Sequence, residues 1–300
     1  MVKFTKLFWH NTKNQKLKLF ATSFIGFAIL LLLAILVMSP FNLLLQAWQI
    51  SILTGQQSMT KLIFMMIGAI ILTICIFSMV LFPIYTGLVR VIRHSVLDSA
   101  QMQWKDLVRS FKKGIWGKSV ILGLMSILFI ILTVIVYGLV NAGVSYLVQK
   151  LFNAISANDI SQGWLQFIIS ILIVLSSFIL SIFVWFTVVY VTNLATSLTE
   201  DASRSVKVHL KEAWHGIKNG HKTFLRFFIG ILLLNLIFII LNQPINYLIQ
   251  QNLAHISQDV AYYLMIIFNI IFLIIRYLIY LLIIGTIIQY FVRRGQKEVK

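Results

Sequence analysis

Six long apolar runs limit what this chain can fold into. Each approaches or exceeds the roughly 20 residues that an α-helix needs to cross the hydrocarbon core of a bilayer. The chain of 300 residues is 60% hydrophobic and only 11% charged, whereas soluble domains carry roughly 25% charged residues. We therefore expect an all-α, polytopic membrane protein. Its six transmembrane helices are expected at about residues 19–37, 62–89, 120–146, 164–193, 223–241 and 262–292.

The basic residues indicate which loops face the cytoplasm. The formal net charge is +17, and there are 25 Lys and Arg residues. Of these, 22 lie in four stretches: residues 1–18, 90–118, 204–226 and 293–300. The other three are Lys61, Lys150 and Arg276. Cytoplasmic loops are enriched in Lys and Arg. We expect a multi-pass protein of the bacterial cell membrane with cytoplasmic N- and C-termini, in contact with anionic headgroups; the charge does not require a nucleic-acid partner.

Two segments between the runs have helical charge patterns. In residues 200–218 an apolar stripe that includes Trp214 lies opposite a basic face, with Ser197 or Thr199 able to cap the N-terminus. Residues 98–118 show the same arrangement. This pattern is typical of a helix in the headgroup plane, and it also suits a helix packed on the protein's own cytoplasmic side. The expected basic faces consist of Lys105, Arg109 and Lys112, and of Arg204, Lys207 and Lys211.

Short internal matches indicate a repeat. Residues 8–10 (FWH) match 213–215 (AWH), and residues 40–46 (PFNLLLQ) match 244–250 (PINYLIQ), with a poorer copy between them. Self-similarity of this kind is typical of repeated supersecondary units. We predict one membrane domain over residues 1–300, built as three helical hairpins that each follow a basic amphipathic interfacial helix. The three repeats cover about 1–97, 98–198 and 199–300.

One stretch resembles a known family. The resemblance lies in Thr199-Glu200, Lys211-Glu212-Ala213-Trp214 and Lys218 before an apolar run, and more broadly in Pro83, Gly87 and Arg90. It is similar to the six-span membrane domain that precedes the catalytic domain in some bacterial glycerophosphodiester phosphodiesterases, and to related stand-alone membrane proteins of unknown role. Those enzymes carry a soluble barrel domain after the membrane part. Because this sequence ends at Lys300, the resemblance implies no phosphodiesterase activity.

The acidic residues and histidines do not form a catalytic pattern. None of the eight acidic residues lies in a predicted span, so no carboxylate pair is available at membrane depth. His215 and His221 are six residues apart and fall on different helix faces. The single cysteine, Cys75, cannot form an intrachain disulfide, and no nucleotide-binding motif is present. We expect a protein that is not an enzyme and needs no cofactor or metal.

Arg276 is the one charged residue in the middle of a predicted span. A central Arg costs about 2.5–3.5 kcal/mol on insertion scales, so it needs partners. Asn, Tyr and backbone groups of the bundle could supply them, as could a bound anion such as a lipid phosphate, or the side chain could reach an interface. The candidate anion or lipid site consists of Arg276, Asn235, Asn269 and Tyr280.

These features favour a non-enzymatic membrane protein that binds or moves lipid or another amphiphile, or that is the membrane partner of such a system. Two alternatives remain. One is a permease-type subunit that works with a separate ATPase, and the other is a structural or immunity-type membrane protein that acts through protein contacts. Phospholipid bound at Arg276 would favour the lipid-binding hypothesis, a co-purifying ATPase would favour the permease-type subunit, and an empty, fully packed bundle would favour the protein-contact hypothesis.

Overall fold

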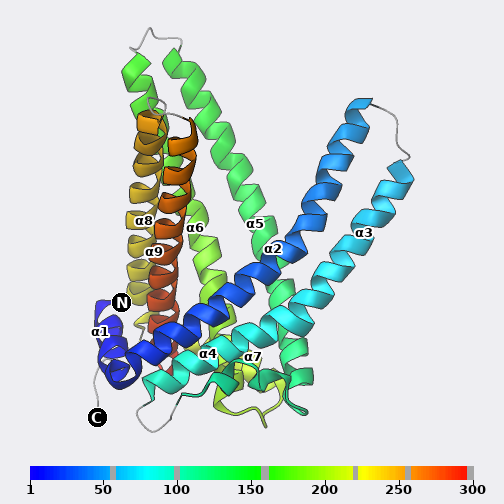
Figure 1. Ribbon diagram of the computed structural model, residues 1–300, viewed down its shortest axis with the longest axis vertical. Helices are drawn as coiled ribbons and strands as arrows, with labels where there is room; N and C mark the ends of the chain where they lie inside the picture. The colour runs from blue at the N-terminus through cyan, green and yellow to red at the C-terminus, as the bar shows by residue number, and fades with distance from the viewer. Residues whose placement is uncertain (55–58, 98–101, 157–161, 219–221, 254–257, 296–300) are drawn as a thin grey trace.

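The structure is a computed structural model that describes residues 1–54, 59–97, 102–156, 162–218, 222–253 and 258–295 (Figure 1). The described residues form helices and connecting turns, without a β-strand. The α-helices are α1 (Val2–Asn11), α2 (Lys16–Thr54), α3 (Met59–Ile76), α4 (Phe82–Val96), α5 (Trp116–Ser156), α6 (Gln162–Glu200), α7 (Val206–Ile217), α8 (Phe224–Leu253) and α9 (Gln258–Val292).

Five of the described helical segments are long and apolar enough to cross a membrane: Lys13–Leu53, Thr60–Val96, Trp116–Asn153, Val174–Glu200 and Tyr262–Val292. They confirm the all-helical class and a multi-pass arrangement. Helix α8 extends over 30 residues. Its segment Phe224–Ile237 is apolar but shorter than a span.

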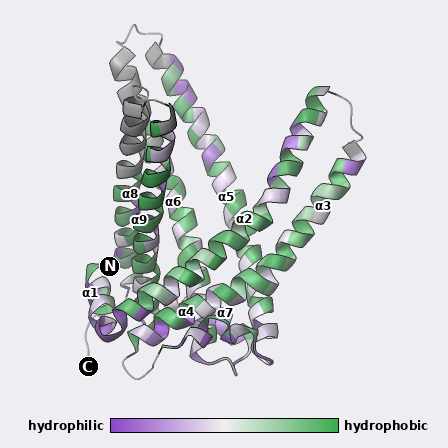
Figure 2. Ribbon diagram, in the orientation of Figure 1, coloured by the Kyte–Doolittle hydropathy of each residue, from purple (hydrophilic) through white to green (hydrophobic). Residues whose placement is uncertain are grey.

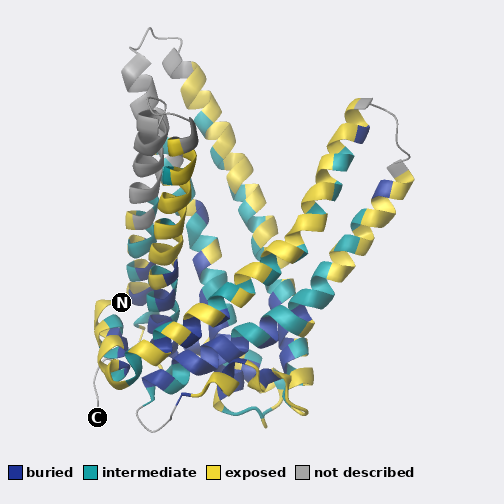
Figure 3. Cartoon of the chain, in the orientation of Figure 1, coloured by how far each residue is buried: buried dark blue, intermediate teal, exposed yellow. Residues whose placement is uncertain are grey.

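The helices meet at one end of the molecule and separate toward the other. Helices α2 and α3 contact each other and lean away from α5 (Figure 1). Hydrophilic residues gather at the end where the helices meet, in α1, α7 and the nearby turns (Figure 2). We call this end the base. Most buried residues also lie near the base, whereas the outer halves of α2, α3 and α5 are largely exposed (Figure 3). Their exposed Leu and Ile side chains are suited to contact with lipid.

The core of the base is formed by α4, α6 and α9, which contact one another. Val89, Ala195 and Ile288, one from each helix, are fully buried in one apolar cluster. Phe8 of α1 and Leu107 of the 102–115 segment belong to the same cluster. The short segments between the long helices are therefore part of the core.

The segment 98–118 does not form the predicted amphipathic helix. Its described part contains two 3₁₀ turns, η3 (Trp104–Leu107) and η4 (Arg109–Phe111). A capping box between Gln103 and Asp106 begins the first turn. Gly114, with φ +87°, follows the second turn in a conformation that few other residues adopt. Leu107 reaches the core from η3, so local turns and burial override the helical spacing.

The helix predicted over 200–218 begins later than expected. Helix α6 continues to Glu200, and α7 begins at Val206 after Ser205. Ala202, Val206 and Leu210 of the apolar stripe pack against a buried cluster that contains Ala213. This stripe therefore covers the protein's own base. Trp214 is the exception, because its side chain is 47% exposed.

Proline affects the helices differently at two positions. Helix α2 continues through Pro40, so residues 41–54 extend the first helix. Before Pro83 the chain forms a π-helical turn, η2 (Phe77–Leu81). Because Pro83 has no N–H group, it cannot donate to the carbonyl of Met79 four residues earlier. The indole Nε1 of Trp116 donates to that carbonyl instead, at 3.1 Å.

Candidate functional site

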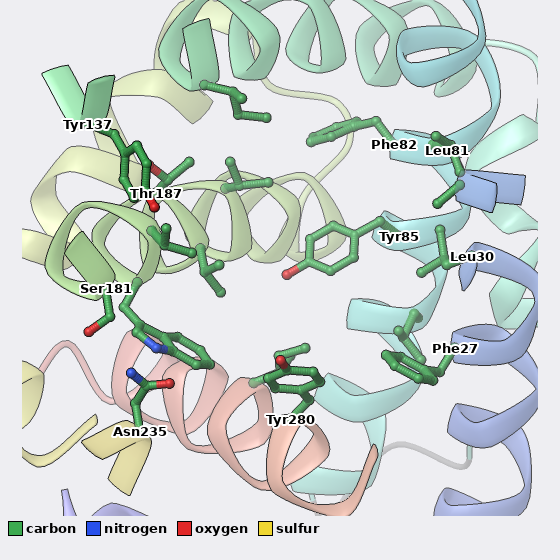
Figure 4. A pocket seen from close by; sticks show the side chains of 18 of the residues that line it. Phe27, Leu30, Leu81, Phe82, Tyr85, Tyr137, Ser181, Thr187, Asn235 and Tyr280 are labelled. Atoms are coloured by element: carbon green, nitrogen blue, oxygen red, sulfur yellow. The ribbon is translucent and has the colours of Figure 1, made fainter. Parts of the chain in front are cut away.

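An apolar cavity lies above the base, between the diverging helices. Its volume is about 720 Å³, within the range of about 300–1,000 Å³ that is typical of small-molecule sites. Residues of α2, η2, α4, α5, α6, α8 and α9 line it (Figure 4). The labelled lining residues are Phe27, Leu30, Leu81, Phe82, Tyr85, Tyr137, Ser181, Thr187, Asn235 and Tyr280. Helix α6 contributes eight of the lining residues and each of the other elements contributes two or three, so the cavity depends on how the helices pack.

The polar groups of the cavity are neutral, and two of them contact hydroxyl groups of residues outside its lining. The hydroxyl of Tyr85 lies 2.6 Å from that of Thr192. Thr187 donates to the hydroxyl of Thr133 at 2.9 Å. The buried amide Nδ2 of Asn235 has no hydrogen-bond partner among the described residues. None of the described lining residues carries a charge, which suits the apolar part of an amphiphile with at most a neutral polar group.

The structure brings three of the four residues of the predicted anion site together. Arg276, Asn235 and Tyr280 line a small void with Trp185. The void measures about 10 Å³, which is room for about one water. Asn269 is exposed two turns earlier in α9 and does not line this void. Arg276 itself is exposed. Asn235 and Tyr280 also line the larger cavity, so Arg276 lies next to the cavity without lining it.

The two predicted basic faces have different environments. Lys105, Arg109 and Lys112 are exposed and line one surface groove of about 560 Å³. Arg204 of the α6–α7 connection instead forms salt bridges with Asp201 of the same connection and with Glu212 of α7. Lys207 and Lys211 are exposed on α7. The first face is therefore a set of neighbouring cations, whereas the second face loses one member to internal ion pairs.

A buried polar cluster at the α6–α7 junction was not predicted. Ser197 Oγ donates to a carboxylate oxygen of Glu212 and lies 2.9 Å from Nδ1 of His209. His209 is fully buried. This burial lowers the pKa of His209, against the opposite effect of Glu212. Ser197, His209 and Glu212 come from two helices, so helical spacing in the sequence does not reveal their contact. The cluster attaches α7 to α6.

Lys118 also attaches the α6–α7 connection to its neighbours. Its Nζ donates to the carbonyls of Ala202, Ser203 and Arg204, at 2.7, 2.8 and 3.0 Å. Within the described residues no group of three or more His, Cys, Asp or Glu side chains is placed to hold a metal ion. The polar groups of the base therefore mainly connect helices, and the cavity is the most developed candidate for binding.

The described helices and the cavity define a helical multi-pass membrane protein with an apolar cavity above a packed base. No protein-family description, curated protein or solved structure matches the chain. The similarity to the membrane domain of glycerophosphodiester phosphodiesterases stays a prediction from the residues quoted above.

Proposed function

We propose that this chain is a non-enzymatic, six-span protein of a bacterial cell membrane that binds a lipid or another amphiphile in the cavity between its helices. The observation that carries the proposal is the uncharged, largely apolar cavity of about 720 Å³. Residues of both α2 and α5 line it, and these two helices diverge away from the base (Figure 1). An apolar chain that enters from the bilayer would meet apolar side chains such as Phe27 and Leu30, and hydroxyl or amide groups such as Asn235.

Three similar contacts support the six-span, three-hairpin arrangement. Each of the three short segments packs on the second helix of a hairpin. Helix α1 packs on α9, the 102–115 segment packs on α4, and α7 packs on α6. A Cβ added to Gly285 of α9 would lie 2.4 Å from the ring of Phe8 of α1, and one added to Gly87 of α4 would lie 1.9 Å from the carbonyl oxygen of Leu107. Asn193 Nδ2 of α6 donates to the carbonyl of Ala213 of α7 at 3.2 Å. This cyclic order is the one that three equivalent repeats would produce.

Three threonines indicate how the second helices of the hairpins align. Each is fully buried at the base, and each hydroxyl donates to the carbonyl four residues earlier. They are Thr86 of α4, Thr192 of α6 and Thr286 of α9. In this alignment the buried residues Val89, Ala195 and Gln289 are also equivalent, because each lies three residues after its threonine. We therefore propose that α8 is also a membrane span, which brings the number of spans to six, and that it is the first helix of the third hairpin.

Filling the cavity tests the binding proposal. Ala34 of α2 and Ser181 of α6 line the cavity, so the double variant Ala34→Trp/Ser181→Trp should exclude a bound chain. Leu36 and Ile179 lie two residues away on the same helices and are exposed, so Leu36→Trp/Ile179→Trp is a matched control. Native mass spectrometry of detergent-purified protein should show several-fold less co-purified lipid for the cavity variant than for the control. Equal lipid retention in two folded variants would refute the proposal.

Thiol labelling tests the orientation. In a variant without Cys75, single cysteines at positions 56, 158 and 257 should react with an impermeant reagent in intact cells, because the connections on that side contain few basic residues. These positions lie outside the described residues. Cysteines at Lys112 and Lys211 should react only after the cells are opened. Labelling of these two positions in intact cells would reverse the proposed orientation.

A further inference from the structure

We propose that the groove over residues 103–112 binds the phosphate headgroup of an anionic phospholipid in the leaflet at the base of the protein. Lys105, Arg109 and Lys112 line this groove, together with Gln103, Asp106, Val108 and Phe111. The site is separate from the cavity, since the two share no lining residue. The groove would therefore be a second lipid contact in addition to the cavity, and this inference does not depend on the proposed function of the cavity.

The groove has an excess of positive charge. Its acidic lining residue, Asp106, is buried, and its Oδ2 accepts from the backbone N–H of Gln103 and lies 3.0 Å from Nδ1 of His94. Its Oδ1 is 3.8 Å from Nη1 of Arg109. The groove thus has one carboxylate, which already has these partners, and three exposed cations. An anion with several acceptor oxygens would be attracted to this arrangement, because charge-assisted hydrogen bonds to phosphate are strong.

A buried arginine of α4, the helix on which residues 103–112 pack, adds to this charge. Arg90 of α4 is 4% exposed, and it interacts electrostatically with both Asp106 and Arg109. Its Nη1 has no hydrogen-bond partner among the described residues. Arg90 therefore adds a further positive charge that acts on both Asp106 and Arg109. This leaves the exposed cations of the groove less well neutralised than a surface ion pair would be.

The loop that carries the cations is held rigidly. Leu107 is 8% exposed and packs against Gly26 and Gly87. The backbone N–H of Met102 donates to Oε1 of Gln15 at 3.2 Å, and Ser110 is fully buried. A fixed loop loses little conformational entropy when it binds, which favours affinity. The groove is therefore organised before a ligand arrives.

The apolar side chains of the loop identify the kind of anion. Val108 and Phe111 line the groove and are 60% and 39% exposed. Trp104 of the same loop and Trp116 at the start of α5 are 48% and 42% exposed. Aromatic side chains at this kind of position are typical of membrane interfaces. Free phosphate would not contact such groups, whereas a phospholipid presents its phosphate beside the start of its acyl chains.

Lipid competition in nanodiscs tests this site. The triple variant Lys105→Gln/Arg109→Gln/Lys112→Gln removes the three cations, and Lys3→Gln/Lys6→Gln/Lys13→Gln is a control that removes the same charge from exposed residues elsewhere at the base. Native mass spectrometry would measure bound phosphatidylglycerol against phosphatidylcholine. We expect the groove variant to lose roughly 10-fold or more of its phosphatidylglycerol preference, because it removes the charge-assisted hydrogen bonds to a phosphate held in the groove. The control should keep the wild-type preference.

Three further measurements separate the explanations. Lys105→Arg/Lys112→Arg keeps the charge and should keep the preference, which shows that loss in the Gln variant is not a folding defect. Retention of lipid in the cavity should be unchanged in the groove variant, so a failure of the cavity proposal would be recognised separately. Equal loss of preference in both Gln variants, or full displacement of phosphatidylglycerol by millimolar inorganic phosphate, would overturn the phospholipid site.

Discussion

Gly87→Ala should destabilise the base of the protein, because the added methyl group has no space beside the 102–111 segment. A Cβ at position 87 would lie 1.9 Å from the carbonyl oxygen, 2.5 Å from the carbonyl carbon and 2.8 Å from the Cα of Leu107. All three are backbone atoms, so rotation of a side chain cannot remove the clash. Ordinary contact begins at 3.4 Å. The 3₁₀ turn η3 must therefore move away from α4, or α4 must deform.

The cost can be estimated from these distances. Overpacking in a well-packed core costs about 1–3 kcal/mol, and a clash with backbone belongs at the upper end. If η3 lifts away, Leu107 also loses part of its burial, which contributes up to about 1.5–3 kcal/mol for a fully buried side chain. Alanine gains about 0.5–1 kcal/mol over glycine inside a helix. The net expected loss in the free energy of unfolding is about 2–4 kcal/mol.

Unfolding in detergent micelles, followed by intrinsic tryptophan fluorescence, measures this loss. Gly68→Ala in α3 is the matched control, because an added Cβ there meets nothing within 4 Å. The control should be neutral or slightly stabilising, whereas Gly87→Ala should unfold at a clearly lower temperature. If the two variants unfold alike, then the 102–111 segment does not pack on α4 as described.

Three further changes test individual contacts by the same unfolding assay. Trp116→Phe removes the donor to the Met79 carbonyl and should cost about 1 kcal/mol, and an unchanged stability would show that this bond contributes nothing. Lys118→Met should cost about 2–3 kcal/mol because it leaves three carbonyls without their donor, while Lys113→Met at an exposed site should stay within about 0.5 kcal/mol. Because burial lowers the pKa of His209, its contribution should be complete above about pH 6.5 and should decline as the pH falls below that value; a His209→Gln variant with the same pH dependence as the wild type would contradict this.

The helical membrane class could be predicted because lipid leaves few alternatives. Within a bilayer, backbone polar groups must be satisfied inside the chain, so a long apolar run forms a helix. Two details at the base could not be predicted from local pattern. The spacing around Trp104 suits a helix, but the Gln103–Asp106 capping box and burial of Leu107 produce 3₁₀ turns instead. Arg204 has the spacing of an exposed basic face, but Asp201 and Glu212 bind its guanidinium.

The candidate sites were predicted only in part. The sequence placed Lys105, Arg109 and Lys112 on one basic face, and the structure gathers them in one groove. It singled out Asn235 and Tyr280 only as neighbours of Arg276, and the structure also places both in the large cavity. Most lining residues of that cavity are ordinary apolar or small polar residues of several helices. Nothing in their spacing distinguishes them from other residues of the same spans.

The sequence by itself determined that this protein is helical and suited to a membrane, because apolar length and the rarity of charge are sufficient for that conclusion. Tertiary structure decided which apolar side chains face protein and which face outward. Leu88 of α4 is 3% exposed and Leu139 of α5 is 71% exposed. Lipid tails are about as apolar as a leucine side chain, so both environments favour the same residue type. Hydropathy therefore cannot locate the cavity, and only the packing of the helices against one another does so.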